Sequence, residues 1–301
     1  MSMLEIHQSD IGSLQLCPGR VLLSQVDGYD RTPSEAMARG SMVHAIISDF
    51  LTNHFDATEW PFKYVGLTTL QGLFTTLADK DGYTLDTIGV DGKYLDAFLF
   101  ECGQIAVDWF QQVFEPTLRD VNPLLVEREL RTTLTSKPQK VVLVGTPDLV
   151  TPGTVFDWKV AGRGWDSNKD GLTKGNFSPQ PPLYLHLVRT AGLGIEPNTF
   201  VFYVYDVRAQ HWEPYETTWT DEQITAAVQN AKHAARMILN DAFQFTPFST
   251  VFGKVQRGWW CSAKFCGAWP ICQGKRMIND GADTEVVRDP RWVTSPEGED
   301  T

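Results

Sequence analysis

The chain has 301 residues, of which 42% are hydrophobic and 12% aromatic, so it can bury a substantial core in one large domain or two small ones. It contains no run of about 18 apolar residues, and residues 1–16 include Glu5 and Asp10. We therefore expect a cytoplasmic protein without a signal peptide or membrane span. The net charge of −11 argues at first against a nucleic-acid partner, because phosphate binding is largely electrostatic.

The charge is unevenly distributed along the chain. Residues 280–301 contain seven acidic residues and two arginines, which predicts a disordered acidic tail that carries −5 of the total. Residues 253–278 contain five basic residues and no acidic residue. The distribution weakens the charge argument against nucleic acid, and we expect residues 1–279 to form a single domain.

The first predicted helix covers about residues 34–55. Ser34 followed by Glu35 is typical of a helix start. Apolar residues then recur at helical spacing, namely Met42, Val43, Ile46 and Ile47. His44 lies in this helix, four residues after Gly40. A lone histidine on such a helix is more often a packed residue than a metal ligand, so the helix alone leaves both interpretations open.

The next two regions predict different structures. Residues 60–92 mix glycine, threonine and aspartate with short apolar runs, which predicts loops with one short helix. Residues 94–114 predict a long helix, because apolar residues recur three and four apart. These residues are Phe98, Cys102, Ile105, Trp109 and Val113. We interpret Cys102 as a small buried hydrophobic residue of this stripe.

Residues 124–134 alternate as a β-strand with Glu127 and Glu129 on one face, although surface glutamates on an edge strand would show the same pattern. A β-hairpin follows. Its first strand is predicted at residues 141–144 and 149–150, its turn at residues 151–154 and its second strand at residues 155–160. Asp148 lies near the end of the first strand, and Asp157 and Lys159 point to one side of the second strand because they are two residues apart.

Two carboxylates and one ammonium group thus converge on one side of the hairpin. Mg²⁺ is usually held by one or two carboxylates with waters and phosphate oxygens, and a nearby lysine can orient or deprotonate the attacking water. An isolated Asp-x-Lys is most often a solvated surface. Here residues 155–160 are apolar on both faces, which predicts a central strand where charges are costly unless paired or metal-bound. The pattern favours a site that cleaves phosphodiesters.

Residues 178–188 predict a helix in which Gln180 and Tyr184 share a face. Strands are predicted at residues 199–207 and 211–218, and a capping-box sequence predicts a helix over residues 220–239. The predicted fold class is therefore α/β, with a helical N-terminal segment before the strands.

The cysteines form a second pattern. Cys17, Cys261, Cys266 and Cys272 are four candidates for one tetrahedral metal site, and Cys102 is left over. Disulfides are not expected in a reducing compartment. Zinc is the usual metal for four cysteines, but structural zinc sites usually show two close pairs, and here one cysteine lies far from a triplet.

The hairpin resembles the signature of the PD-(D/E)XK nucleases, with Pro147-Asp148 followed by Asp157 and Lys159. This resemblance implies a restriction-endonuclease-like mixed sheet flanked by helices and DNA as the substrate. It implies Mg²⁺ or Mn²⁺ bound by both aspartates, and a lysine that activates or orients water. It also implies that Glu127 is the additional acid that many members place beside the metal.

Two further motifs resemble the RecB-type branch of that superfamily. Gly40 and His44 match a helical G-x-x-x-H motif, which implies that His44 binds the metal. Gln180 and Tyr184 match the Q-x-x-x-Y motif that follows the catalytic lysine, which implies contacts with the DNA strand. The sequence contains no P-loop motif, so we expect a nuclease without its own helicase motor.

The cysteine layout resembles the iron–sulfur RecB-type nucleases, which include the AddB nuclease domain and the CRISPR-adaptation exonucleases. The resemblance implies a [4Fe–4S] cluster that joins the two ends of the domain as a C-terminal staple. Its implied ligands are Cys17, Cys261, Cys266 and Cys272. The first gap of the triplet has four residues here, whereas these nucleases usually have two.

Together these resemblances imply a metal-dependent DNA nuclease acting on single-stranded ends, flaps or forks in repair, recombination or replication. Partners would be recombination or replication proteins, with no membrane association. Two alternatives are an iron–sulfur redox or regulatory DNA-binding protein without cleavage activity, and an accessory protein of a recombination or CRISPR-adaptation complex with little activity alone.

Overall fold

The computed structural model describes residues 3–8, 10–11, 34–55, 59–60, 66–81, 84–137, 140–162, 165, 178–239, 248–251 and 254–257. The predicted cluster ligands Cys17, Cys261, Cys266 and Cys272, like the predicted tail 280–301, lie outside these residues. The chain divides into two compact units. A larger unit comprises Pro33–Thr132 and Gly145–Thr225, and a smaller unit comprises Met1–Thr32, Thr133–Val144 and Ala226–Thr301.

The larger unit contains a five-stranded mixed sheet in the order β2-β5-β6-β7-β8. Its strands are β2 (Leu125–Val126), β5 (Leu149–Val150), β6 (Thr154–Ala161), β7 (Thr199–Asp206) and β8 (His211–Thr218). β6 and β7 are parallel, and the other neighbouring pairs are antiparallel. The strand that carries Asp157 and Lys159 is therefore central, as its apolar residues on both faces predicted.

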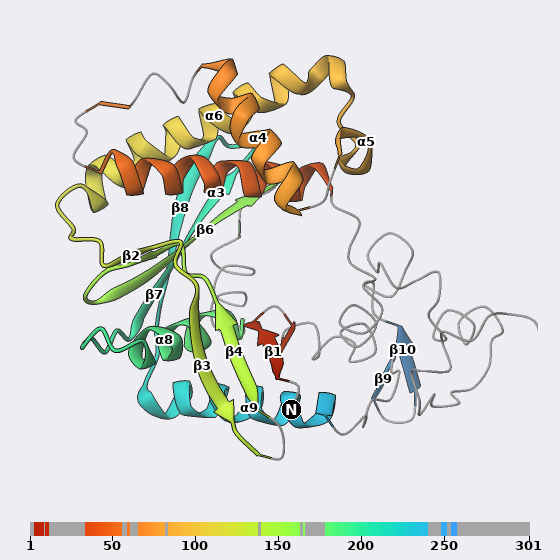
Figure 1. Cartoon of the computed structure of the whole chain (residues 1–301), viewed down its shortest axis with the longest axis vertical. Coiled ribbons are helices and arrows are strands. Elements are labelled where there is room, and N and C mark those ends of the chain that lie inside the picture. The colour runs from red at the N-terminus through yellow and green to blue at the C-terminus, as the bar shows by residue number, and fades with distance from the viewer. Residues whose placement is uncertain are drawn as a thin grey trace, which may run out of the picture. The chain divides into compact units, whose positions relative to one another are not determined.

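Helices cover one face of this sheet, and in Figure 1 α3, α4 and α6 lie together on that side. The helical elements there are α3 (Glu35–Asn53), α4 (Leu67–Asp81), α5 (Leu85–Ile88), the 3₁₀ helix η2 (Gly92–Tyr94), α6 (Leu95–Trp109) and the π-helix η3 (Phe110–Leu118). Their apolar side chains and those of the sheet form one core cluster. Within it, the rings of Trp109 and Trp158 meet edge to face at 5.4 Å between centroids.

Helix α8 (Gln180–Thr190) packs on β7, where the rings of Tyr184 and Phe200 lie 6.2 Å apart. Pro181 and Pro182 occupy its first turn, where a missing N–H costs little. β7 pairs with β8 in antiparallel orientation.

Two predicted helix starts are confirmed by their caps. Ser34 Oγ accepts a hydrogen bond from the Met37 N–H at 3.4 Å, at the start of α3. Thr220 and Gln223 exchange the two hydrogen bonds of a capping box at the start of α9 (Asp221–Leu239). In the part of the chain that the structure describes, no helix combines the length and the apolar character needed to cross a membrane.

Most of a three-stranded sheet in the order β1-β4-β3 belongs to the smaller unit. Its strands are β1 (Leu4–His7), β3 (Leu130–Thr135) and β4 (Val141–Gly145). β1 and β4 are parallel, with Leu4 opposite Val141. A second, antiparallel pair consists of β9 (Phe248–Val251) and β10 (Lys254–Arg257), and β10 is the described part of the basic region 253–278.

Two strand predictions are wrong because each predicted strand is divided between two sheets. Residues 124–134 form β2 and β3, which are separated at Glu127, a residue with φ of +44°. Residues 141–144 and 149–150, predicted as one strand, form β4 and β5, which are separated by residues 146–148 and belong to different sheets. Pro147 has no N–H and cannot donate to a strand ladder. Asp148 therefore precedes β5 and does not end a continuous strand.

The prediction of mostly loop for residues 60–92 is also wrong, because α4 is a helix of 15 residues. Leu70 and Phe74 are buried, and the ring of Phe74 meets that of Phe98 on α6 at 6.1 Å. Threonine and glycine lower the intrinsic helix propensity of this segment, but packing against α3 and α6 outweighs it.

The helix predicted over residues 94–114 is confirmed and continues further than predicted. α6 leads directly into η3, which contains Pro116 and ends at Leu118. The Arg119 N–H donates to the Phe114 carbonyl, five residues earlier, and such wide turns are typical of π-helices.

We expect Gly145→Ala to lower the free energy of unfolding by about 1–3 kcal/mol, the usual cost of overpacking a core. A Cβ at Gly145 would lie 2.6 Å from Tyr184 Cε1 and 2.7 Å from Leu187 Cδ1, and both side chains are buried. Urea denaturation measures the change. Gly153→Ala is the control, because a Cβ at Gly153 meets nothing within 4 Å. Equal losses of stability in both variants would contradict the close packing.

Candidate active site

The candidate site is built on β6. Because side chains alternate along a strand, Phe156 and Trp158 pack against the helical core while Asp157 and Lys159 face the other side. Lys159 Nζ forms an ion pair with Asp157 Oδ2, so the predicted shared orientation of these two side chains is confirmed. Asp157 is only 2% exposed, and a buried carboxylate requires such a partner.

Asp157 is held from two sides. The side-chain amide of Gln180, at the start of α8, donates to Asp157 Oδ1 at 2.5 Å, while Lys159 pairs with the other oxygen. Burial raises the pKa of Asp157 to about 6, against the opposing effect of Lys159. Burial alone would lower the pKa of Lys159, but Asp157 and Asp148 raise it above its usual value. Lys159 is therefore cationic at neutral pH and acts here as a hydrogen-bond donor.

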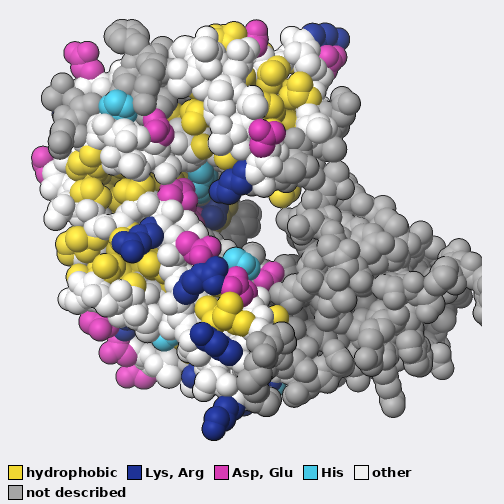
Figure 2. All heavy atoms as spheres, in the orientation of Figure 1, with side chains coloured by type: hydrophobic (Ala, Val, Ile, Leu, Met, Phe, Trp, Pro, Cys, Tyr) yellow, Lys and Arg dark blue, Asp and Glu magenta, His cyan; other side chains and the backbone are white. Residues whose placement is uncertain are grey.

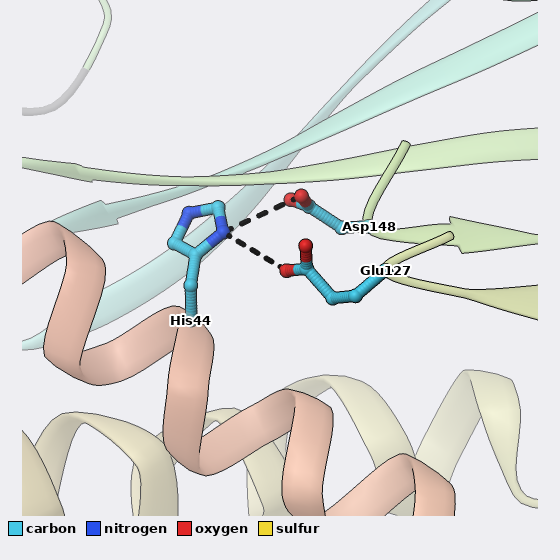
Figure 3. Close-up of side chains that lie close together, drawn as sticks. All are labelled: His44, Glu127 and Asp148. Carbon is cyan, nitrogen blue, oxygen red and sulfur yellow. Dashed lines mark ion pairs between the residues drawn. The ribbon is translucent and has the colours of Figure 1, made fainter. Parts of the chain in front are cut away.

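Asp148 is held by two hydrogen bonds from backbone N–H groups. Its side-chain Oδ2 accepts one from the Trp158 N–H at 2.5 Å, and its backbone carbonyl accepts one from the Glu127 N–H at 3.1 Å. The φ of +44° at Glu127 lies in a region that costs about 1–3 kcal/mol for residues other than glycine. This break between β2 and β3 brings the Glu127 carboxylate beside that of Asp148 (Figure 3).

His44 on α3 completes the cluster, and Figure 3 shows its ring pointing toward both carboxylates. His44 Nδ1 lies 3.4 Å from Asp148 Oδ1 and 3.5 Å from Glu127 Oε1. On its other side, His44 Nε2 lies 2.8 Å from the carbonyl oxygen of Trp158. One potential ligand atom from each of the three side chains lies within 4.8 Å of the others.

This arrangement favours a cation between His44 and the two carboxylates. Because Nε2 faces a carbonyl oxygen, it must carry the proton, and a neutral ring then presents its Nδ1 lone pair to two anions. Burial alone would lower the pKa of His44, but Asp148 and Glu127 outweigh it and raise the pKa to about 10. A bound proton or a metal ion removes the repulsion. Metal-binding histidines commonly donate their other N–H to a carbonyl in this way, so the residues present fit a divalent cation.

The structure places the predicted site residues in two adjoining groups of the larger unit. One group consists of His44, Glu127 and Asp148. The other consists of Asp157, Lys159 and Gln180. Among the described residues, the cluster with metal-ligand spacing does not include Asp157, whose oxygens are taken by its two partners.

Gln180 and Tyr184 are buried, at 7% and 6% exposure. Gln180 supports Asp157, and Tyr184 hydrogen-bonds to the backbone of Thr146, two residues before Asp148. Burial raises the pKa of Tyr184, so its hydroxyl stays protonated. In this structure both residues support the site from α8, and their contact with DNA stays a prediction.

Sequence reasoning missed the role of the Trp158 peptide groups, which bind Asp148 through the N–H and His44 through the carbonyl. The sequence did offer one indication of this role: Trp158 lies between Asp157 and Lys159, so its peptide groups must lie close to the side chains of the site. Glu129, predicted to share a face with Glu127, instead pairs with Arg131 at 2.7 Å and is exposed.

Comparison with known proteins places the chain in a family. No curated protein matches the chain. Among solved structures, the chain is similar to the one described as the crystal structure of SSO0001, with 15% sequence identity and a TM-score of 0.36, over 76% of this chain and 95% of that chain. A likeness this distant supports no statement about function. The model of the PD-(D/E)XK nuclease superfamily matches residues 6–273, and the chain therefore belongs to that superfamily.

Proposed function

We propose that this protein is a metal-dependent deoxyribonuclease that hydrolyses phosphodiester bonds in single-stranded DNA ends, flaps or forks during repair, recombination or replication. The observation that carries the proposal is the meeting of His44 Nδ1 with two carboxylates, beside a buried Asp157 that is paired with the half-buried Lys159. The family supplies the reaction class. The form of the DNA and the pathway rest on the sequence motifs.

Mg²⁺ or Mn²⁺ would be held by His44, Glu127 and Asp148, with Asp157 as a further candidate. Carboxylates suit both ions, and an imidazole adds a softer nitrogen ligand that Mn²⁺ accepts more readily than Mg²⁺ does. When bound, such an ion would supply Lewis-acid activation of the phosphate and of water. The carbonyl of Trp158 fixes the ring of His44, so Nδ1 is directed to the cluster without further reorganisation.

Lys159 is proposed to donate hydrogen bonds to the attacking water or to a phosphate oxygen. Its ammonium is cationic, and Asp157 holds it in place. Gln180 in turn holds the other oxygen of Asp157. A donor that is already oriented before the reaction stabilises developing negative charge without a further free-energy cost of reorientation.

The central test is cleavage of labelled single-stranded, blunt and forked DNA with Mn²⁺, with Mg²⁺ and with a chelator. We expect wild-type protein to cleave only with added metal. Asp148→Asn and Glu127→Gln should each lower the rate by more than about 100-fold, because even outer partners of metal ligands contribute about 10- to 100-fold.

The matched control is Glu129→Gln, because Glu129 is an exposed glutamate two residues from Glu127 and pairs only with Arg131 among the described residues. It should keep near-normal activity. If Glu127→Gln and Glu129→Gln behave alike, Glu127 has no special place in the site. Binding of DNA without cleavage by wild-type protein would favour the alternative of an accessory DNA-binding protein in a recombination or CRISPR-adaptation complex.

His44→Ala should raise the Mn²⁺ concentration for half-maximal activity at least about tenfold, because it removes the ligand whose tautomer the Trp158 carbonyl fixes. Mn²⁺ should also protect the variant less than wild type against thermal unfolding. His211→Ala is the control, since His211 is exposed at the start of β8. Titration curves of His44→Ala and wild type that superimpose would make His44 a structural residue.

The proposed [4Fe–4S] cluster rests on the sequence alone, because its four cysteines lie outside the described residues. We expect purified protein to be brown, and Cys17→Ala or Cys266→Ala to lose both the colour and much of the stability. Cys102→Ala should keep the colour, because Cys102 is fully buried in α6, where burial raises the pKa of its thiol to about 12. Stoichiometric zinc without iron after anaerobic purification would rule out the cluster and leave the nuclease proposal intact.

A further inference from the structure

We propose that Arg128 binds a DNA phosphate next to the one that is cleaved and thereby positions the strand in the active site. This inference rests on the proposed nuclease function and adds a residue that the sequence motifs did not include. Arg128 directly follows Glu127 in the segment between β2 and β3 and belongs to neither strand. Its side chain is exposed.

Arg128 differs from most of the described arginines of the larger unit because its side chain has no partner among the described residues. Within the described ranges it forms no hydrogen bond and no ion pair. The arginines with carboxylate partners are Arg39 with Glu35 and Glu101, Arg119 with Glu115, Arg131 with Glu129, and Arg189 with Glu196 and Asp221. A guanidinium group without a carboxylate partner remains available for phosphate, which it binds with matching geometry.

The cations of the site are already paired with its own carboxylates, so a second phosphate of a bound strand needs a cation of its own. Glu127, Asp148 and Asp157 are acidic, and the ammonium of Lys159 is already paired with Asp157. In Figure 2 the visible surface over α3, α4 and α6 carries acidic, basic and hydrophobic side chains intermixed.

Arg128 is also close enough to the site to act on it. Its Cα is one peptide unit, about 3.8 Å, from that of the proposed metal ligand Glu127. We place the next phosphate of a single-stranded substrate beside this segment when the reacting phosphate lies at the His44–Glu127–Asp148 cluster. Arg128, a long side chain without a partner among the described residues, can neutralise that second phosphate.

The experiment compares Arg128→Ala with Arg208→Ala. Arg208 is the matched control because it is likewise exposed and its side chain has no partner among the described residues. It follows β7 at the end where Asp206 pairs with Ala161. That end lies about 13 Å along the strand from Phe202, the partner of Asp157, at about 3.3 Å per residue.

Two readouts are measured at several salt concentrations: binding of a fluorescent single-stranded oligonucleotide in EDTA, and kcat and KM with Mn²⁺. Arg128→Ala should weaken binding and raise KM by about tenfold, the usual size for a charged hydrogen bond, with kcat within about twofold of wild type. The slope of log Kd against log salt should fall by about 0.7, the value for one phosphate contact on a single strand. Arg128→Lys should retain the wild-type slope, because it keeps the charge.

A wild-type slope in Arg128→Ala, or an equal change of slope in Arg208→Ala, would overturn the proposal. So would a loss of kcat with unchanged KM and binding. Binding in EDTA does not require cleavage, so these outcomes test Arg128 even if the wild-type protein proves inactive, a result that would count only against the nuclease function.

Discussion

Trp158 is the residue on which the geometry of the site depends. Its indole is 1% exposed and packs edge to face on Trp109 in the core beneath the helices. Its N–H binds Asp148 and its carbonyl binds His44. The same residue thus belongs to the hydrophobic core through its side chain and to the polar site through its backbone, so core packing fixes the distance between α3 and the loop before β5.

The acidic groups around this backbone can be buried only because each has a partner. Asp157 has Lys159 and Gln180, and Asp148 has the Trp158 N–H and the ring of His44. Without metal, a proton on His44 supplies the positive charge, as its raised pKa indicates. A metal ion has to displace that proton. Metal binding is therefore weaker at lower pH, because the proton on His44 competes with the metal ion. In either state, a proton or a metal ion balances the negative charge of the carboxylates.

The sequence predicted correctly those features that local pattern determines. The cap at Ser34, the capping box at Thr220 and the central position of β6 each depend on a few neighbouring residues. The division at Glu127 was missed because alternation continues across it, and the division at Pro147 because the apolar residues on its two sides were assigned to one strand. The sheet that each half joins is decided by distant partners. Only one short helix was predicted where α4 has 15 residues, because packing against α3 and α6 stabilises α4 and outweighs its weak helix propensity.

The division at Glu127 shows how one local distortion can serve two purposes. A continuous strand would have placed Glu127 and Glu129 on one face as equivalent surface acids. The positive φ at Glu127 instead separates them: Glu127 joins His44 and Asp148, while Glu129 pairs with Arg131 outside the cluster. Strain at a residue other than glycine persists only where surrounding contacts impose it, and here the hydrogen bond from the Glu127 N–H to the Asp148 carbonyl is such a contact. The distortion also takes Arg128 out of both strands. The same backbone break therefore places the Glu127 carboxylate in the cluster and leaves the neighbouring Arg128 without a partner among the described residues.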